Sequence, residues 1–176
     1  MTYATSWSKS HHAGPKRALA VDSDVAGRIL EKSNAPVIVI GARIKELNGE
    51  VLDRVIKLAK EMKIPVVATA HSGKFLVEKG FKDYVEMGVV EVTNLLADPE
   101  WGGINGAGKY DLVIVVGAHL DLMNATFQTL KNFTKVPSLC IDRYFMVNAN
   151  YSFPNLNEEM WLSYLDGLMV KLGILD

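Results

Sequence analysis

Two uninterrupted apolar segments, PVIVIGA at residues 36–42 and LVIVVGA at 112–118, constrain the fold of this chain most strongly. Runs of Val and Ile without polar alternation are typical of strands that a parallel sheet buries on both faces. Each run is far shorter than the roughly 20 residues that a membrane-spanning helix requires. We therefore expect both segments to form central strands of a soluble protein that contains helices as well as strands.

Apolar residues at helical spacing alternate with the predicted strands along the chain. A first helix is predicted to begin at Gly14-Pro15, because proline suits the first position of a helix. Its apolar stripe consists of Ala18, Val21, Val25 and Ile29. Further helical stripes cover residues 51–62, 120–130 and 161–172. A capping pattern formed by Asn155 and Glu158 precedes the last of them.

Two more strands and a less regular middle region complete the pattern. PVVATA at 65–70 and PSLCID at 137–142 have the composition of buried strands. Between residues 74 and 108, short helical patterns are mixed with glycines, which predicts one or two short helices followed by a loop. This alternation is typical of an open α/β sandwich of three layers, in which helices cover both faces of a mainly parallel sheet.

Composition limits the possible partners and the number of domains. The 176 residues are typical of one domain, which we expect at residues 15–176 after an N-terminal arm at 1–14. The balance of 19 Lys and Arg against 20 Asp and Glu leaves no basic field for nucleic acid or for an anionic membrane. The N-terminal segment lacks the apolar centre of a secretory signal, and a single cysteine cannot form an internal disulfide. We therefore expect a cytoplasmic protein.

The carboxyl ends of the predicted strands are the expected ligand site. Open α/β sheets bind ligands beyond these ends, where the strand order reverses. Two of the ends carry Gly-Ala, which lets a ligand or a neighbouring backbone approach closely. The residues predicted to form this binding crevice are Gly41, Ala42, Arg43, Ala70, His71, Ser72, Gly73, Lys74, Gly117, Ala118, His119 and Asp142.

The sequence HSGK, directly after the predicted strand PVVATA, admits several interpretations. It does not complete a P-loop, because Ala68 stands where the first glycine is required and Phe75 where a hydroxyl should hold magnesium. A catalytic pair of His71 and Ser72 would lack both a third orienting group and the turn that exposes a nucleophilic serine. Two alternatives stay open: an anion site at a helix start, assisted by the charge of Lys74, and a plain strand-to-helix turn.

The remaining motifs indicate contact or packing rather than chemistry. His11-His12 has no third metal ligand nearby, so a mobile or partner-contacting arm is the favoured interpretation. The glycine-rich GGINGAG at 102–108 has the wrong order for a dinucleotide fingerprint and is a second candidate for partner contact. Cys140 lies in an apolar strand and is expected to be an inert core thiol. One cysteine also excludes an iron-sulfur cluster held by this chain alone.

Several segments together resemble one known family. They are GPKRALAVD at 14–22, PVIVIGA, PVVATAHSGK at 65–74, YDLVIVVGAHLDLMNATFQTLKNF at 110–133 and NANYSFPNLNEEMWLSYLDGLM at 148–169. On these segments the chain is similar to the epsilon subunit of the archaeal acetyl-CoA decarbonylase/synthase complex, the carbon monoxide dehydrogenase epsilon family. The front half alone also resembles the FAD-binding central domain of thiamine-diphosphate enzymes, which has the DHS-like NAD/FAD-binding fold.

The family resemblance implies a non-catalytic companion subunit. In that family, a large alpha subunit carries the nickel-iron-sulfur centres that oxidise CO. Epsilon joins it in the CO dehydrogenase component, with a stabilising role or a role in electron transfer to FAD. The resemblance therefore implies a homo-oligomer or an alpha-epsilon hetero-oligomer, and no activity of this chain alone.

The FAD-binding relatives imply which residues would line the cofactor. They have a glycine turn after the first strand, a strand end finishing in Gly-Lys, and a later acidic residue. These features match Gly41 to Arg43, Ala70 to Lys74, and Asp142. The alternative to the subunit role is a stand-alone FAD- or NAD-binding protein or oxidoreductase of the same fold.

Overall fold

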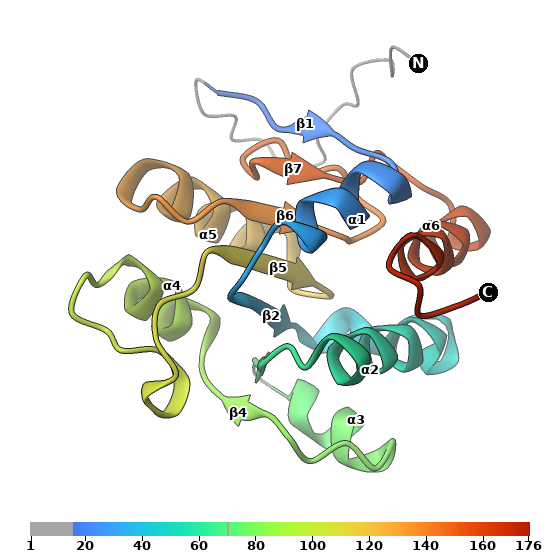
Figure 1. Cartoon of the computed structure of the whole chain (residues 1–176), viewed down its shortest axis with the longest axis horizontal. Helices are drawn as coiled ribbons and strands as arrows, with labels where there is room; N and C mark the ends of the chain where they lie inside the picture. Colours follow the sequence, from blue (N-terminus) through green and yellow to red (C-terminus); the bar gives the residue numbers. More distant parts are fainter. Residues whose placement is uncertain (1–15, 70) are drawn as a thin grey trace.

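Seven strands form one sheet in the structure, a computed structural model that describes residues 16–69 and 71–176 (Figure 1). Their order across the sheet is β1-β7-β6-β5-β2-β3-β4, and each hydrogen-bonded pair is parallel. The sheet that was predicted to be mainly parallel is therefore parallel throughout the described residues. The strands are β1 (Leu19–Ala20), β2 (Pro36–Ile40), β3 (Val66–Ala68), β4 (Val85–Glu86), β5 (Leu112–Val116), β6 (Ser138–Cys140) and β7 (Tyr151–Ser152).

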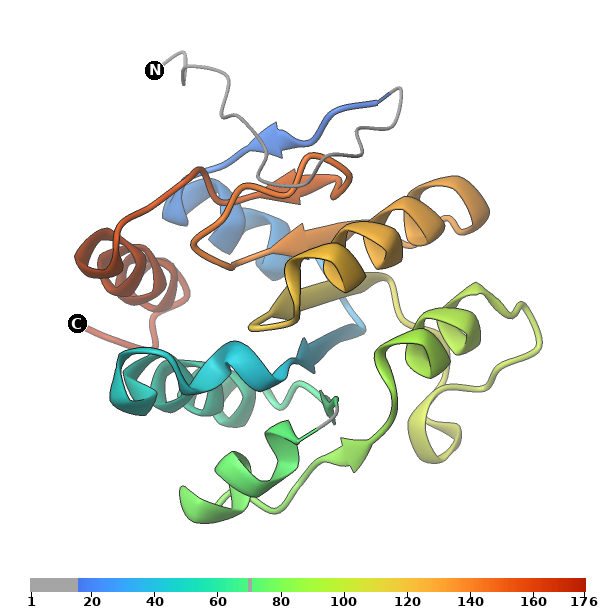
Figure 2. The same ribbon diagram turned by 180° about the vertical axis from the view of Figure 1, so that it is seen from behind.

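Helices cover both faces of the sheet and give the predicted three layers. The α-helices of the described residues are α1 (Ser23–Glu31), α2 (Glu50–Met62), α3 (Ser72–Glu78), α4 (Val89–Ala97), α5 (Leu120–Phe133) and α6 (Glu158–Lys171). Short 3-10 helices lie in the connections: η1 (Ala42–Lys45), η2 (Leu47–Gly49) and η3 (Ile104–Gly106). Helices α1, α2 and α6 pack on one face, whereas α4 and α5 pack on the other (Figures 1 and 2). None of the described helices is both long and apolar enough to cross a membrane.

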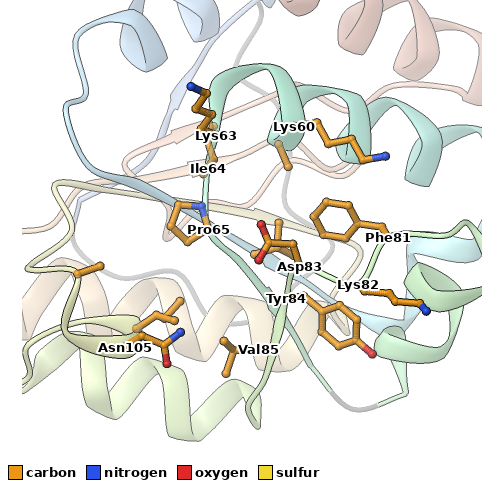
Figure 3. A pocket seen from close by; sticks show the side chains of 14 residues that line it. Lys60, Lys63, Ile64, Pro65, Phe81, Lys82, Asp83, Tyr84, Val85 and Asn105 are labelled. Carbon is orange, nitrogen blue, oxygen red and sulfur yellow. The ribbon is translucent and has the colours of Figure 1, made fainter.

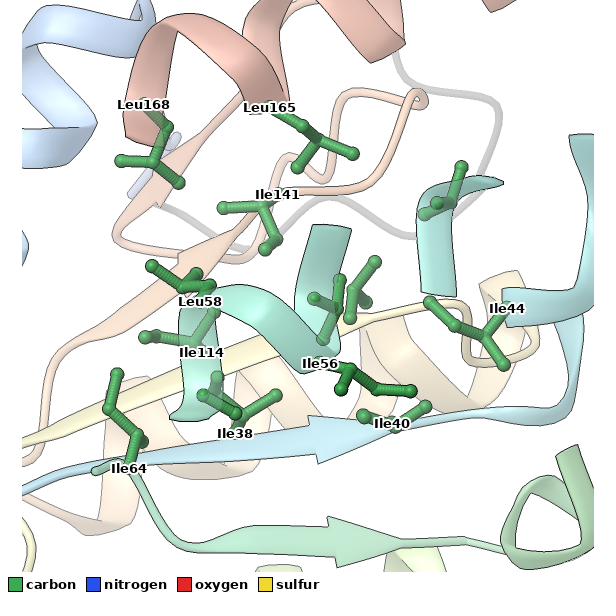
Figure 4. Packing of buried hydrophobic residues seen from close by; sticks show 14 of the residues in the cluster. Ile38, Ile40, Ile44, Ile56, Leu58, Ile64, Ile114, Ile141, Leu165 and Leu168 are labelled. Carbon is green, nitrogen blue, oxygen red and sulfur yellow. The ribbon is translucent and has the colours of Figure 1, made fainter. Parts of the chain in front are cut away.

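Alternate side chains of the central strands point to opposite faces and build two apolar clusters. Ile38 and Ile40 of β2 pack with Ile114 of β5 in the cluster beneath α1, α2 and α6 (Figure 4). Val37 and Val39 of β2 belong to the cluster beneath α4 and α5. Because helices bury both faces of these strands, the two segments that form them show no polar alternation.

The start of α1 differs from the prediction. Leu19–Ala20 forms the edge strand β1, and the helix follows it. Asp22 caps this helix, because its Oδ1 accepts a hydrogen bond from the N–H of Val25 at 2.9 Å. The prediction of helix over residues 16–22 is therefore wrong. Its expected beginning at Gly14-Pro15 and the predicted N-terminal arm lie outside the described residues.

The cap of α6 is two residues away from the predicted one. Asn157 precedes this helix, and its side-chain oxygen accepts a hydrogen bond from the N–H of Met160 at 2.8 Å. Asn155, the predicted cap, accepts a hydrogen bond from the N–H of Phe145 at 3.0 Å instead. Asn155 therefore ties the segment before α6 to the connection between β6 and β7.

The sequence did not predict the short strands β1, β4 and β7. Each has two residues, and each lies at an edge of the sheet or next to one. The middle region otherwise follows the prediction, because α3 and α4 are two short helices and a loop with the turn η3 follows them.

Candidate functional site

The strand order reverses between β2 and β5, so the carboxyl ends of these strands lie side by side in the sheet. Ile40, the last residue of β2, is in register with Val116, the last residue of β5. The predicted residues Gly41 and Gly117 follow directly. The structure therefore gathers the predicted strand ends at the topological switch point, where open α/β sheets commonly bind ligands.

Gly41 and Gly117 lie against backbone of the protein itself. A Cβ atom on Gly41 would be 2.2 Å from Ala118 Cα, and one on Gly117 would be 2.7 Å from the amide nitrogen of Ile44. The N–H of Arg43 donates a hydrogen bond to the carbonyl oxygen of Gly117 at 2.7 Å. Gly117 also has a φ of +70°, which favours glycine. Close approach of a neighbouring backbone is thus the reason these positions lack side chains.

Asp142 lies beside these glycines and is fully buried. Its Oδ2 accepts a hydrogen bond from the N–H of Gly117 at 3.0 Å, and its Oδ1 accepts one from the N–H of Tyr144 at 3.4 Å. Burial raises the pKa of the Asp142 carboxyl above its ordinary value, while the nearby positive charge of Arg43 opposes this shift. The carboxyl group thus links the segments that follow β5 and β6.

Two arginines flank Tyr144 and form a charged cluster with Glu46. The guanidinium carbons of Arg43 and Arg143 lie 5.0 Å and 4.9 Å from the centroid of the Tyr144 ring. Arg43 Nη2 donates a hydrogen bond to Glu46 Oε1 at 2.8 Å. Arg143 Nη1 donates one to Glu158 Oε1 at 2.9 Å. We call Arg43, Glu46, Arg143 and Tyr144 the arginine cluster.

The arginine cluster has unused hydrogen-bond donors. Arg43 Nη1 and Arg143 Nε are buried and have no hydrogen-bond acceptor among the described residues, although Arg143 Nε lies 3.7 Å from Glu46 Oε2. Of the cluster, only Arg43 was predicted as a site residue. Arg143 and Tyr144 were missed, although they directly follow Asp142 and their position after a strand could have identified them.

The HSGK segment forms a turn into α3. His71 precedes the helix and is exposed, whereas Ser72 is fully buried. The Ser72 hydroxyl lies within hydrogen-bonding distance of the carbonyl oxygens of Ile40 and Thr69, at 3.0 and 2.7 Å. Ser72 therefore holds the ends of β2 and β3 together and is not exposed as a nucleophile. Lys74 is exposed, and its ammonium group lies over the Phe75 ring.

The other predicted residues also follow the carboxyl ends of the strands. Gly73 is buried, and a Cβ atom there would be 2.4 Å from Glu86 Oε1. Ala42 is half-buried in η1, while His119 is exposed and precedes α5. Ala70 lies outside the described residues. Contact of any of these residues with a cofactor stays a prediction.

A cavity of about 500 Å³ opens at the other end of the strands, beside the amino ends of β3 and β4 (Figure 3). Pro65 and Phe81 contribute apolar surface, and Lys60, Lys63 and Lys82 also line the cavity. This volume is typical of small-molecule sites, which enclose roughly 300–1,000 Å³. None of the predicted crevice residues that the structure describes lines this cavity.

Comparison with known proteins matches nearly the whole chain. A family model described as CO dehydrogenase beta subunit/acetyl-CoA synthase epsilon subunit matches residues 3–169. The chain is 37% identical over 166 residues to the acetyl-CoA decarbonylase/synthase complex subunit epsilon of Methanothermobacter thermautotrophicus, and the match covers 94% of each chain.

Two further relatives are also named as epsilon subunits of the acetyl-CoA decarbonylase/synthase complex. The subunit epsilon of Methanothrix soehngenii is 39% identical over 145 residues, which cover 81% of this chain and 76% of the relative. The subunit epsilon 1 of Methanosarcina barkeri is 32% identical over 159 residues, which cover 90% of this chain and 92% of the relative. These matches confirm the resemblance that the sequence segments indicated, whereas the similarity to the FAD-binding domain of thiamine-diphosphate enzymes stays a prediction. The chain belongs to the CO dehydrogenase beta subunit/acetyl-CoA synthase epsilon subunit family.

Proposed function

We propose that this chain is a non-catalytic epsilon subunit that binds and stabilises the nickel-iron-sulfur alpha subunit of a CO dehydrogenase component. The observation that carries the proposal is the near full-length match to proteins named as subunit epsilon of the acetyl-CoA decarbonylase/synthase complex. A subunit of a multi-subunit complex acts through its partners, and the alpha subunit is the partner that the family resemblance implies.

The donor groups of the chain support a role without redox metals of its own. Cys140, the single cysteine, is 0% exposed, and its Sγ lies 3.6 Å from Met123 Sδ. Burial raises the pKa of the Cys140 thiol, which disfavours the thiolate that binds metals. Among the described residues, no three His, Cys, Asp or Glu side chains are grouped so that they could hold a metal ion. The partner would therefore supply the nickel and iron-sulfur centres.

Reconstitution with the alpha subunit tests this role. We expect the purified chain to form an alpha-epsilon complex that is detected by light scattering after size-exclusion chromatography. Because a bound partner stabilises the folded state, CO oxidation by the complex should survive heating longer than that by alpha alone. The chain alone should not reduce a viologen dye with CO. Such activity of the isolated chain, or failure to bind alpha, contradicts the proposal.

FAD binding at the switch point is a second candidate role, and it would allow electron transfer from the alpha subunit to FAD. FAD binding is favoured because the predicted residues follow the carboxyl ends of adjacent parallel strands. The fit is partial, because Ser72 and Asp142 are committed to internal hydrogen bonds. His71, Lys74 and the unpaired Nη1 of Arg43 are left to hold the phosphate groups, because Nε and Nη2 of Arg43 donate to Glu46. FAD itself would supply the redox chemistry.

Calorimetric titration with FAD tests the second candidate. Saturable heat is expected for the wild-type chain, and Lys74→Glu should weaken binding at least about tenfold if the ammonium group contacts a phosphate. Lys57→Glu, on the exposed side of α2, is the matched control and should bind FAD like the wild type. The absence of heat and of protection from hydrogen exchange at the strand-end loops would remove this candidate. Retention of FAD or NAD through gel filtration without any partner would instead favour a stand-alone cofactor-binding protein.

A further inference from the structure

The carboxylate of Glu46 is shared by the two guanidinium groups of the arginine cluster. Its Oε1 accepts hydrogen bonds from Arg43 Nε and Nη2 at 3.0 and 2.8 Å, and its Oε2 lies 3.7 Å from Arg143 Nε. The two arginines belong to separate segments, because Arg43 lies in η1 after β2 and Arg143 follows β6. One carboxylate of the chain thus occupies the point where these arginines meet.

The Glu46 carboxylate leaves part of the cluster unsatisfied. Arg43 Nη1 and Arg143 Nε are buried, and neither has a hydrogen-bond acceptor among the described residues. The other two nitrogens of Arg143 donate to Glu158 and to the Tyr144 hydroxyl. Arginine stays charged at any physiological pH, so the free donors cannot be removed by loss of a proton. The cluster therefore has room for more acceptor atoms than one carboxylate supplies.

Glu46 also balances the charge of Arg43. It is the one acidic side chain that forms an ion pair with Arg43 in the part of the chain that the structure describes. The buried Asp142 is also near, but its oxygens accept hydrogen bonds from the backbone of Gly117 and Tyr144. If Glu46 moved away, Arg43 would have no side-chain acceptor for its three nitrogens.

Glu46 is open to solvent and lies next to strained backbone. Its side chain is 30% exposed, against 23% for Arg43 and 19% for Arg143. Leu47 and Asn48 follow with φ values of +56° and +53°, in the left-handed region that residues with a side chain seldom adopt. Strained backbone of this kind is frequent at ligand clamps and switch regions. A ligand can therefore reach the Glu46 carboxylate, and a rearrangement of this segment would relieve strain.

A phosphoryl group matches the donors of the cluster better than a carboxylate does. Four guanidinium nitrogens, Nε, Nη1 and Nη2 of Arg43 and Nε of Arg143, have either Glu46 or no acceptor among the described residues. A terminal phosphoryl group presents three oxygens instead of two, and arginine binds phosphate through paired, charge-assisted hydrogen bonds. The cluster also lies beside the strand ends of the switch point, where ligands of open α/β sheets bind.

We propose that Arg43 and Arg143 form a phosphoryl-binding site, which Glu46 occupies and closes when no ligand is bound. The phosphoryl group displaces the Glu46 carboxylate and accepts hydrogen bonds from both guanidinium groups, including the two donors that are now unpaired. FAD and free phosphorylated compounds both carry such a group. The site does not depend on the proposed binding of the alpha subunit.

Calorimetric titration of the full-length chain with inorganic pyrophosphate, ADP and FAD tests the site. Glu46→Gln removes the competing charge and should raise the affinity for pyrophosphate at least about tenfold. Adding Arg143→Gln to this variant should reverse the gain, because the second guanidinium group is lost.

The three probes identify the source of the phosphoryl group. Equal gains for all three show that the phosphoryl group alone is recognised. A gain for ADP and FAD that exceeds the gain for pyrophosphate assigns the site to a nucleotide. A gain for pyrophosphate and ADP but not for FAD assigns it to free phosphorylated compounds. Each of these results supports the site.

Glu158→Gln is the matched control for Glu46→Gln. It makes the same change in net charge and removes the other carboxylate that binds Arg143. The Glu158 side chain is 62% exposed, so its ion pair is screened by solvent. The affinity of this control for pyrophosphate should stay within about threefold of the wild type. Near-ultraviolet circular dichroism of the buried Trp161 should show that every variant is folded.

Three results would overturn the site. Equal gains for Glu46→Gln and Glu158→Gln would mean that only net charge matters. The absence of heat with every probe for Glu46→Gln would mean that the arginines bind no phosphoryl group. An unchanged affinity after Arg143→Gln is added would mean that the two arginines do not act together.

The same variants separate the site from the proposed roles of the chain. Failure of the wild type to bind the alpha subunit removes the leading role and leaves the phosphoryl site in place. A wild type that binds no FAD, together with tight binding of pyrophosphate by Glu46→Gln, removes the FAD role and supports the site.

Discussion

The backbone N–H of Gly117 donates a hydrogen bond to Asp142 Oδ2 over 3.0 Å, and both residues are buried. This bond joins the end of β5 to the end of β6 at the switch point of the sheet. A buried carboxyl group is costly in its charged form, and burial accordingly raises the pKa of Asp142. The stability of the fold should therefore depend on the protonation of this group.

Asp142→Asn should remove part of the pH dependence of stability. Because the pKa of Asp142 is raised in the folded state, the folded chain binds the proton more tightly than the unfolded chain. Its contribution to the free energy of unfolding is therefore full below the ordinary carboxyl pKa near 3.9 and is lost as pH rises through the raised pKa. Asparagine keeps an acceptor for the N–H of Gly117 but does not titrate. Urea unfolding across this pH window should show a wild-type decline that the variant lacks, and parallel curves would contradict the assignment.

Gly41→Ala should destabilise the protein strongly. The new Cβ atom would lie 2.2 Å from Ala118 Cα and 2.4 Å from the carbonyl oxygen of Gly117, so backbone must move. We expect a loss of about 3 kcal/mol or more in the free energy of unfolding. Gly102→Ala is the matched control, because nothing lies within 4 Å of its new Cβ atom. Equal unfolding midpoints in urea for the two variants would show that the two strand ends do not meet as described.

Cys140 should resist thiol reagents in the folded protein. It is fully buried in β6, and burial raises the pKa of its thiol, so little thiolate is present or accessible. Reaction with 5,5′-dithiobis(2-nitrobenzoate) should occur only as fast as the protein opens, and it should become rapid in guanidinium chloride. A fast reaction under native conditions would mean that the strand is accessible, against the structure.

The ion pair between Arg54 and Asp166 should contribute little to stability despite its good geometry. Arg54 Nε and Nη2 donate to the two carboxylate oxygens at 2.7 and 2.9 Å and connect α2 to α6. Both side chains are partly exposed, and solvent screens their attraction. A double-mutant cycle with Arg54→Gln and Asp166→Asn should therefore give a coupling energy of at most about 1 kcal/mol, decreasing with added salt. A coupling of several kcal/mol that salt does not change would contradict this expectation.

The central strands could be predicted from the sequence, but the edges of the sheet could not. PVIVIGA and LVIVVGA identify β2 and β5 because burial on both faces requires unbroken apolar sequence. A strand of two residues, such as Leu19–Ala20, carries no periodic signal, and its pairing with β7 depends on sequence far away. Apolar residues from Ala18 onward recur at helical spacing. The predicted helix therefore began several residues before the true cap at Asp22.

The candidate site was predicted in position but not in its contacts. The carboxyl ends of neighbouring parallel strands lie side by side, and so do the residues that follow them. Gly41 and Gly117 could therefore be placed together from the sequence. The hydrogen bonds of Ser72 to neighbouring carbonyl oxygens and the stacking of Arg143 on Tyr144 depend on side-chain geometry across several segments. No spacing in a single sequence encodes such contacts.

The pairing of β1 with β7 has a consequence for how the chain reaches its folded state. Leu19 and Ala20 lie in register with Tyr151 and Ser152, so the first strand of the described residues is joined to the last. Until residues 151–152 have been synthesised, β1 has no neighbouring strand, and β6 is the outermost strand of an incomplete sheet. Contacts of such long sequence separation also slow folding. A nascent chain therefore offers no finished surface at this border until the segment that forms β7 has been made.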